Sequence, residues 1–406
     1  MRTYARGRGA LAVAAVTPVL LIAGCSSPGD DGVTGVRPPP VMPTVTRATP
    51  APAATPTPTA TSAADLGGMA ALVTAAKREG RLEVTAPLPE RANYGEIIKA
   101  FTAAYEIKVS LDLPAGSSQD EIDVVNQLKG SGRREGDGPA PDVLDLGMPV
   151  ALASTSLFAP YRVETWNDIP ERQKDPTGLW FQDHGGLLSI GYDSAEVPDV
   201  TSVSDLLDPA YRNKVALSGD PTRSDAAFYA VQMVSLAIGG SLDDIGDGMY
   251  FFTHLVAAGN FVPVHATTET VKSGKTPVVL DWDYRSAAHV AEVPTWKVFV
   301  PENAALVAYR AQAISKHAPH PAAARLWVEF LASDEGQHLR AKGGAQPVRT
   351  IPMTTARSRG QATAGALPRI SGTPAFLSQE QLMKAKATLD YGWPKAMAIG
   401  VKAGTG

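Results

Sequence analysis

The chain has a single cysteine, Cys25, among its 406 residues. One thiol cannot form an internal disulfide, and it cannot build a cysteine-based zinc or iron–sulfur site. An excess of positive charge is also lacking, because 37 Lys and Arg stand against 41 Asp and Glu and give a net charge of -4. No nucleic-acid partner is therefore expected. With 44% hydrophobic residues, the chain still has enough apolar material for a sizeable core.

Aromatic residues are missing between Tyr4 and Tyr94. Within this gap, residues 26–64 are a low-complexity run of Pro, Thr, Ala and Gly, a composition that favours extended polyproline II over helix or strand. No core can form without large apolar side chains, so residues 25–65 are interpreted as a tether. At polyproline rise this tract could reach on the order of 100 Å.

Residues 1–24 are typical of a secretory signal peptide, with three arginines ahead of an apolar stretch and small residues at its end. The apolar stretch is about half the length needed to span a bilayer, so a transmembrane anchor is not expected. The segment Leu21 to Cys25 (LIAGC) resembles the bacterial lipobox, in which the cysteine is diacylated and becomes the mature N-terminus. That resemblance implies a lipoprotein on the outer face of the cytoplasmic membrane.

From residue 66 onward, strand and helix patterns alternate, which predicts parallel βαβ units in an α/β fold with two lobes. The first part shows helices at 69–79, 94–105 and around 122–128, and strands at 82–86, 107–111 and 143–146. The second shows strands at 215–217, 261–264, 278–282 and 296–300, and helices at 226–238 and 250–256. Asn93 and Glu96 are spaced like a capping box ahead of the second helix.

Motifs for catalysis and for cofactors are mostly lacking. No phosphate loop or dinucleotide fingerprint is found, and neither a cofactor nor a metal is predicted. Gly186, Ser189 and Gly191 come close to a nucleophile elbow, but the first glycine stands one residue too early. A surface-anchored hydrolase that uses Ser189 is therefore the alternative function from another class.

Ligands of open parallel α/β sheets bind beyond the carboxyl ends of the strands, so the loops at those ends are candidate sites. After the first strand, Pro87, Leu88 and Tyr94 are candidate ligand-binding residues, although a plain turn explains the same pattern. After the third strand, Gly147 would let the backbone approach a ligand.

The loop after strand 215–217 contains Thr222, Arg223 and Ser224 just ahead of a helix. Hydroxyl groups, free backbone N–H groups and a guanidinium together suit an oxyanion at a helix N-terminus. The alternative is that Thr222 or Ser224 caps the helix while Arg223 points to water.

Strand 278–282 ends in Trp282, Asp283 and Tyr284, which are also candidate ligand-binding residues. Acids beside aromatic rings could surround an amine through charge pairing and cation–π contact. Strand alternation places Asp281 and Asp283 opposite Trp282 unless the strand ends between them. One of the two acids can instead cap the next helix.

Six segments together resemble the bacterial ABC-transporter solute-binding lipoproteins, and within them the type II extracellular group for iron(III), polyamines and organophosphates. The resemblance covers nearly all of residues 67–353. The segments are PDVLDL (141–146), LFAPY (157–161), IGYD (190–193), VALSGDPTRS (215–224), VVLDWDY (278–284) and residues 311–336. The last is the most specific, with a strand, a Pro-punctuated turn and a long helix that ends in Ser-Asp-Glu-Gly.

This resemblance implies a monomeric, non-enzymatic receptor whose two lobes close around a small charged solute, which an ABC permease then takes up. Lobe 1 would comprise residues 66–190 and 306–406, and lobe 2 residues 191–305. Two crossing strands, near 189–194 and 306–313, would place Tyr192 and Arg310 at the hinge.

The charge of the solute stays open at this point. Ferric-iron members of the group carry adjacent tyrosines, whereas Tyr284 and Tyr309 are each followed by an arginine, which disfavours a second cation. Ferric iron is therefore kept as the alternative within the same family.

Asp281 and Asp283 favour a polyamine-like cation, whereas Arg223, Arg285 and Arg310 favour a phosphate, a phosphonate or a carboxylate. We lean slightly to the organic anion, because three guanidiniums on predicted cleft segments outweigh two acids of which one can be a helix cap.

Overall fold

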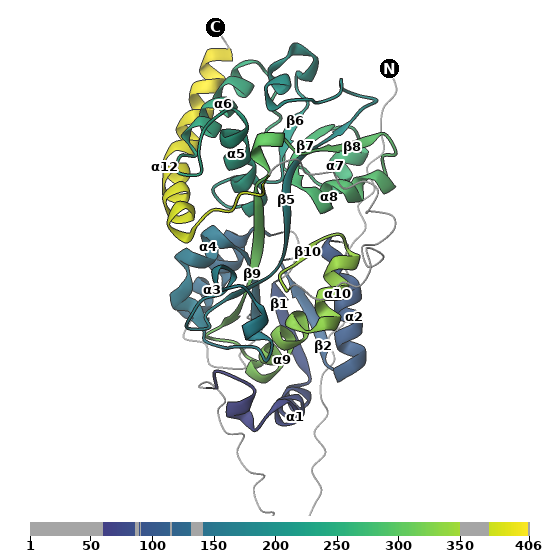
Figure 1. The fold of residues 1–406 in the computed structure, drawn as a ribbon, viewed down its shortest axis with the longest axis vertical. Coiled ribbons are helices and arrows are strands. Elements are labelled where there is room, and N and C mark those ends of the chain that lie inside the picture. Colours follow the sequence, from purple (N-terminus) through teal and green to yellow (C-terminus); the bar gives the residue numbers. More distant parts are fainter. Residues whose placement is uncertain are drawn as a thin grey trace, which may run out of the picture. The chain divides into compact units, whose positions relative to one another are not determined.

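The computed structural model describes residues 60–85, 89, 91–113, 116–130, 141–349 and 373–404, except for the side chains at 128–130 and 403–404 (Figure 1). Cys25, Pro87 and Leu88 lie outside the described residues. The described residues belong to one unit, Thr55–Gly406. None of their helices combines the length and the apolar composition that a membrane crossing needs.

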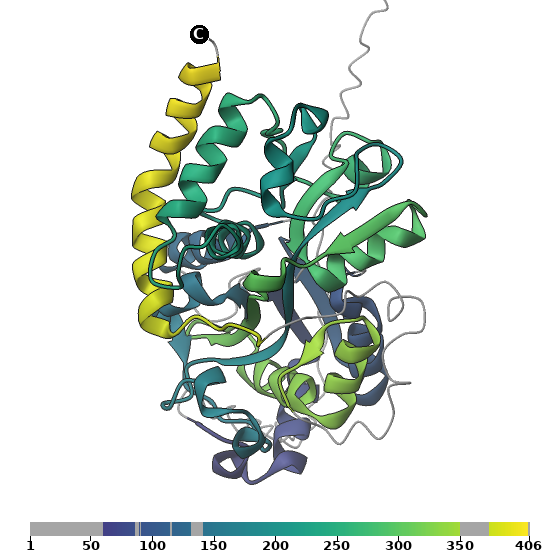
Figure 2. The same cartoon turned by 45° about the horizontal axis from the view of Figure 1, so that its top comes forward.

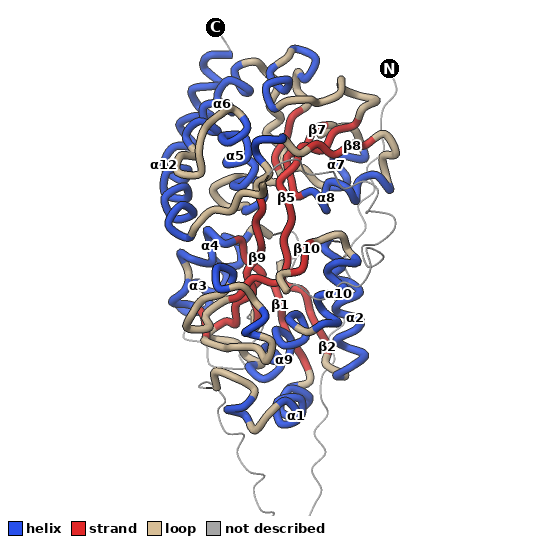
Figure 3. Tube along the Cα trace, viewed as in Figure 1, coloured by secondary structure: helices blue, strands red, loops and turns tan. Residues whose placement is uncertain are grey.

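The strands form a single mixed sheet. They are β1 (Arg81–Thr85), β2 (Lys108–Asp112), β3 (Val143–Gly147), β4 (Phe158–Ala159), β5 (Phe181–Asp193), β6 (Val215–Leu217), β7 (Val278–Trp282), β8 (Trp296–Phe299), β9 (Val307–Ser315) and β10 (Gln346–Pro347). Their order is β2-β1-β3-β9-β5-β7-β6, with β8 and β10 also paired to β5 and β4 to β9 (Figure 3).

We call β2-β1-β3-β9 and the elements around them the first half, and β6, β7 and β8 with their surroundings the second half. Strand β5 pairs with β9 up to Leu187 and with β7 and β8 from Leu188 onward, so it passes from one half into the other. Figure 1 shows β5 and its partner β9 running side by side between the halves.

Parallel pairing is confined to the outer strands, β2-β1-β3 and β6-β7. All pairs made by β5 and β9 are antiparallel. The predicted α/β fold with a mixed sheet is confirmed, but the sheet is not mostly parallel. The reason is that the strands that cross between the halves run against their neighbours on both sides.

Helices cover the sheet in both halves. They are α1 (Met69–Glu79), α2 (Tyr94–Tyr105), α3 (Ser118–Gly130), α4 (Met148–Ala153), α5 (Asp225–Ala237), α6 (Gly246–Ala257), α7 (Thr268–Lys272), α8 (Asp283–Ala288), α9 (Pro321–Ala332), α10 (Asp334–Lys342) and α12 (Gln379–Gly404).

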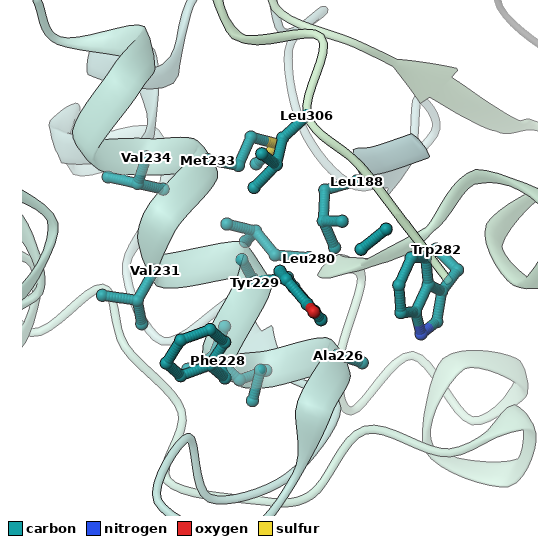
Figure 4. Packing of buried hydrophobic residues seen from close by; sticks show 14 of the residues in the cluster. Leu188, Ala226, Phe228, Tyr229, Val231, Met233, Val234, Leu280, Trp282 and Leu306 are labelled. Carbon is teal, nitrogen blue, oxygen red and sulfur yellow. The ribbon is translucent and has the colours of Figure 1, made fainter. Parts of the chain in front are cut away.

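Each half is packed around one central helix. In the first half, the predicted stripe of α9 is buried, and Trp327 meets Phe101 of α2 edge-on with ring centroids 5.0 Å apart. In the second half, α5 is buried almost throughout, and Figure 4 shows its Tyr229 and Met233 packed with Leu280 of β7. These two cores hold the loops between them in place.

Most predicted elements are present with boundaries within a few residues, but two expectations are wrong. Asn93 has φ 61° and caps nothing with its side chain, because its Nδ2 donates to the carbonyl of Leu339 at 2.9 Å. Residues 261–264 make only a single bridge to β6, at Phe261. The chain turns away there, since Val264 N donates to Val262 O at 2.8 Å.

The C-terminal helix α12 lies along α6, where it is yellow in Figure 2, and it also touches α4. Its stripe of Leu382, Ala385, Leu389 and Trp393 is buried, as its amphipathic pattern predicts. Trp393 meets Phe252 of α6 with centroids 5.4 Å apart. We expected this segment on the first lobe, whereas the apolar face of α6 draws it mainly to the second half.

Candidate functional site

Two adjoining cavities lie between the first and second halves. The first, of about 220 Å³, is lined by Glu121 and Arg310 from the first half and by loop residues 218–220 and 223–225 from the second. The second, of about 210 Å³, extends along α8 to His289. Both cavities are lined by Arg91, Ser218 and Arg285, so they form one cleft.

The loop after β6 is held by hydrogen bonds within itself. Asp220 accepts from the backbone N–H of Thr222 at 2.8 Å and from its hydroxyl at 2.7 Å. The hydroxyl of Ser224 donates to the carbonyl of Ser218 at 2.8 Å. The hydroxyl groups of Thr222 and Ser224 therefore shape the loop and do not cap α5, and of the two residues only Ser224 lines the first cavity.

Arg223 reaches across the cleft to the first half. Its Nη2 lies 2.6 Å from Asp120 and 2.8 Å from Asp123 of α3. The hydrogen bonds that Arg223 donates to Asp123 and Asp120 raise the pKa of its guanidinium. The side chain predicted to hold an oxyanion is thus bound to two carboxylates, which the sequence reasoning missed although their spacing of three places them on one helix face.

Arg310 forms the floor of the cleft. Its Nε lies 2.5 Å from Asp145 of β3, and its Nη1 lies 2.5 Å from Asp225 at the start of α5. Burial disfavours the charge, but the carboxylates of Asp225 and Asp145 outweigh it and hold the pKa of Arg310 well above its ordinary value. The guanidinium that we predicted at the hinge is thus held by two carboxylates and lines the cleft.

Gly147 allows this network to form. A Cβ atom at this position would lie 2.2 Å from the Cβ of Asp225, so any other residue would push α5 away from the end of β3. The predicted close backbone approach at Gly147 is therefore present, but it is an approach to Asp225.

Glu121 of α3 is a buried acid in the wall of the first cavity that sequence reasoning missed. The hydroxyl of Thr85 donates to its Oε2. Burial raises the pKa of Glu121 well above its ordinary range. Burial therefore favours the neutral form of this carboxyl group in the wall of the cavity.

Arg285 of α8 lines both cavities and is not fully paired. Its Nη1 lies 3.5 Å from Asp281, and its buried Nε has no hydrogen-bond partner among the described residues. Burial, followed by the positive charges of Arg91 and Arg285, lowers the pKa of His265 against the opposing effect of Asp281. Positive groups from both halves thus converge beside Ser218.

The three candidates at the end of β7 have different places. Trp282 is fully buried and stacks on Tyr284, with centroids 6.2 Å apart. Asp283 begins α8 and accepts from the N–H groups of Leu187 and Tyr284 at 3.0 and 2.9 Å. Only Tyr284 lines the cleft, and burial raises its pKa to about 12. The strand does end between Trp282 and Asp283.

The remaining candidates do not line the cleft. Tyr94 is buried, donates to Asp145 and lies under the guanidinium of Arg340, which is 4.1 Å from its ring. Tyr192 donates to Asp199 at 3.2 Å. Ser189, the alternative nucleophile, is fully buried and donates to the carbonyl of Asp281 at 3.0 Å.

Tyr284 and Tyr309, the two tyrosines relevant to ferric iron, line different cavities and do not converge in the cleft. Among the described residues, no group of three or more His, Cys, Asp or Glu side chains is placed to hold a metal ion.

Two half-sheets that share a crossing strand, with a charged cleft between them, define a type II periplasmic-binding fold. Residues 150–366, more than half of the chain, match the family model described as bacterial extracellular solute-binding protein. The chain belongs to this family of solute-binding receptors of ABC importers.

Solved structures share the fold over most of the chain. Iron-bound HitA from Pseudomonas aeruginosa is 19% identical, with a TM-score of 0.55 over 80% of this chain and 99% of that chain. AfuA from Actinobacillus pleuropneumoniae, solved with fructose-6-phosphate, is 17% identical, with a TM-score of 0.60 over 79% and 99%.

A putative spermidine/putrescine transporter protein from Listeria monocytogenes is 14% identical, with a TM-score of 0.56 over 78% of this chain and 99% of that chain. No curated protein sequence matches the chain.

Proposed function

We propose that the cleft captures a small organic solute through an oxyanion group, a phosphate, a phosphonate or a carboxylate, and presents it to an ABC permease. The observation that carries this proposal is Arg285, a largely buried guanidinium that lines both cavities and has an Nε–H without a partner among the described residues. A buried donor of this kind is stabilised by an anionic acceptor.

Three of the acids that line the cleft support an anion over a polyamine. Asp225 is bound to Arg310, and Asp120 is bound to Arg223. Asp281 faces Arg285. Because each of these carboxylates already faces a guanidinium, they offer a cationic ligand little uncompensated negative charge.

Binding to both halves would bias closure. Arg91 lies on the first half and Arg285 on the second, so an oxyanion between them lowers the free energy of the closed arrangement in particular. In this proposal the halves move as the predicted lobes, residues 66–190 with 306–406 and residues 191–305, except that α12 moves with the second half, on which it packs, and one chain supplies the whole cleft as a monomer.

The test is ligand-induced thermal stabilisation of the wild-type chain with a hexose phosphate, a phosphonate, a dicarboxylate, spermidine and ferric citrate. A ligand at 100 times its Kd adds about 2.7 kcal/mol of stability. We expect a response to one of the anions, and a response to spermidine alone would contradict the proposal.

Calorimetric titration of variants then tests whether Arg285 is the side chain that binds the anion. Arg285→Ala should weaken binding of the responding anion by about 10- to 100-fold, as expected for one charge-assisted hydrogen bond. Arg285→Lys should recover part of the affinity. Arg78→Ala, an exposed arginine on α1, is the matched control and should leave the Kd unchanged.

We also propose that Cys25 carries the lipid that anchors the receptor to the outer face of the cytoplasmic membrane, on the basis of the lipobox resemblance. Cys25→Ser should release the protein into the medium, as measured by cell fractionation. Continued retention in the membrane fraction would remove this part of the proposal.

A further inference from the structure

A third cavity, of about 420 Å³, lies under residues 373–382, which we call the strap. The strap is joined to the first residues of β9 by a parallel bridge, in which Val307 N donates to Ala375 O at 2.9 Å and Ala375 N to Ala305 O at 2.8 Å. The cavity is lined by Tyr309, whereas the next residue, Arg310, lines the cleft. Neighbouring strand side chains point to opposite faces, so this cavity lies behind the crossing strands.

Two of the polar residues that line the strap cavity, Arg172 and Gln173, are neighbours in the sequence. Gln173 is 4% exposed, and its Nε2, although beside the phenol of Tyr309, forms no hydrogen bond within normal geometry to any described residue. The preceding residue, Arg172, places its guanidinium 4.2 Å above the ring of Phe376. Both residues line the cavity, so hydrogen-bond donors gather at this end.

The rest of the lining combines apolar residues, among them Met148, Tyr229, Val307, Leu377 and Leu382, with the neutral polar residues Gln182, Ser378, Gln379 and Gln381. Among the residues that the structure describes, no acidic side chain and no second cation line the cavity. A single guanidinium beside an amide Nε2 that has no hydrogen bond of normal geometry to a described residue favours one carboxylate, and the apolar part of the wall favours a hydrocarbon body. The volume falls within the range of roughly 300 to 1,000 Å³ that small-molecule sites occupy.

We propose that the strap cavity is a second binding site, separate from the cleft, for a small monocarboxylate with an apolar body. The carboxylate is held by Arg172 and the Nε2 of Gln173, and the hydrocarbon lies between the strap and β9. A ligand in this place braces the strap against the strands that join the two halves.

The test is isothermal titration of the full chain with hexanoate, and with hexylamine and hexan-1-ol at the same concentrations. Hexanoate should bind more tightly than both other compounds. Arg172→Gln should weaken hexanoate binding by about tenfold or more through loss of a charge-assisted hydrogen bond. Gln173→Leu should also weaken it, and Val307→Phe, on the same strand face as Tyr309, should abolish it by filling the cavity.

Arg285→Ala is the control for the cleft and should leave hexanoate binding unchanged. If Val307→Phe does not fold, Arg172→Gln and the comparison of the three compounds decide, because Arg172 is exposed. No measurable hexanoate binding, equal binding of hexylamine, or loss of binding in Arg285→Ala but not in Arg172→Gln would each overturn the proposal.

Discussion

Arg310 and Arg223 both join the two halves of the molecule through pairs of carboxylates, yet their surroundings differ. The side chain of Arg310 is 6% exposed and that of Arg223 is 41% exposed. In the buried network, any missing partner leaves an unsolvated charge, whereas water and salt can replace a partner at the rim of the cleft. The first network therefore serves as a fixed joint, and the second can open and close.

Breaking the buried network should have the largest effect. Arg310→Met keeps the size of the side chain but leaves Asp145 and Asp225 without their cation. We expect a loss of about 3 to 5 kcal/mol in the free energy of unfolding, the range for breaking a buried ion pair. Urea denaturation at neutral pH measures it.

Arg310→Lys is the matched control, because it keeps the charge without the two-pronged geometry, and it should fall between the wild type and Arg310→Met. A loss below about 1 kcal/mol for Arg310→Met would mean that the buried network relaxes as freely as a surface pair.

The elements of the fold were readable from the sequence because their signals are local. The apolar run at 278–282 gives the bounds of β7, and the helical spacing of apolar residues at 322–331 predicts α9, which is buried on all sides. The strand predicted at 261–264 is wrong, because the β-branched residues of this segment favour a strand while the backbone turns at Val264. Likewise, nothing in the pattern of α12 identifies α6 as its partner.

The site was only partly readable, because charge pairing depends on partners far apart in sequence. Arg223 and Asp120 are separated by 103 positions, and only the approach of the two halves brings them together. The same holds for Arg310 and Asp145, which are 165 positions apart. Candidate loops could therefore be located from strand ends, but paired and unpaired guanidiniums could not be told apart.

Glu329 of α9 sharpens the comparison, because it is a buried carboxylate without an ion pair among the described residues. It accepts from the hydroxyl of Tyr161 at 2.8 Å and from Glu164 N at 2.9 Å. Burial raises its pKa from 4.5 to about 7. Between these two pH values the folded chain keeps a proton that the unfolded chain has lost, so this group lowers stability as the pH rises.

Glu329→Gln should remove this pH dependence. Relative to wild type, the variant should gain about 1 to 3 kcal/mol in unfolding free energy between pH 4.5 and pH 8. Urea denaturation at both pH values measures the difference in unfolding free energy. Glu335→Gln, at an exposed residue of α10, is the control. If the difference in unfolding free energy between variant and wild type is the same at pH 4.5 and pH 8, Glu329 titrates like an exposed acid and the prediction is wrong.

Breaking the exposed contacts of Arg223 with Asp120 and Asp123 should have the smallest effect on stability. Arg223→Ala is expected to cost at most about 1 kcal/mol of unfolding free energy, because the contacts of Arg223 with the two acids are solvated, and high salt should remove that cost.

The effect of Arg223→Ala on ligand affinity separates two roles of this arginine. If Arg223 only latches the halves together, Asp120→Asn with Asp123→Asn should change the Kd for the cleft ligand as Arg223→Ala does, and adding all three substitutions should change it no further. In the other role, Arg223 releases Asp120 and Asp123 and binds the oxyanion itself. Arg223→Ala should then weaken ligand binding by about 2 kcal/mol. The double Asn variant should strengthen ligand binding, because it frees the guanidinium. Titration of the three variants distinguishes the two roles by the sign of the change in the double Asn variant.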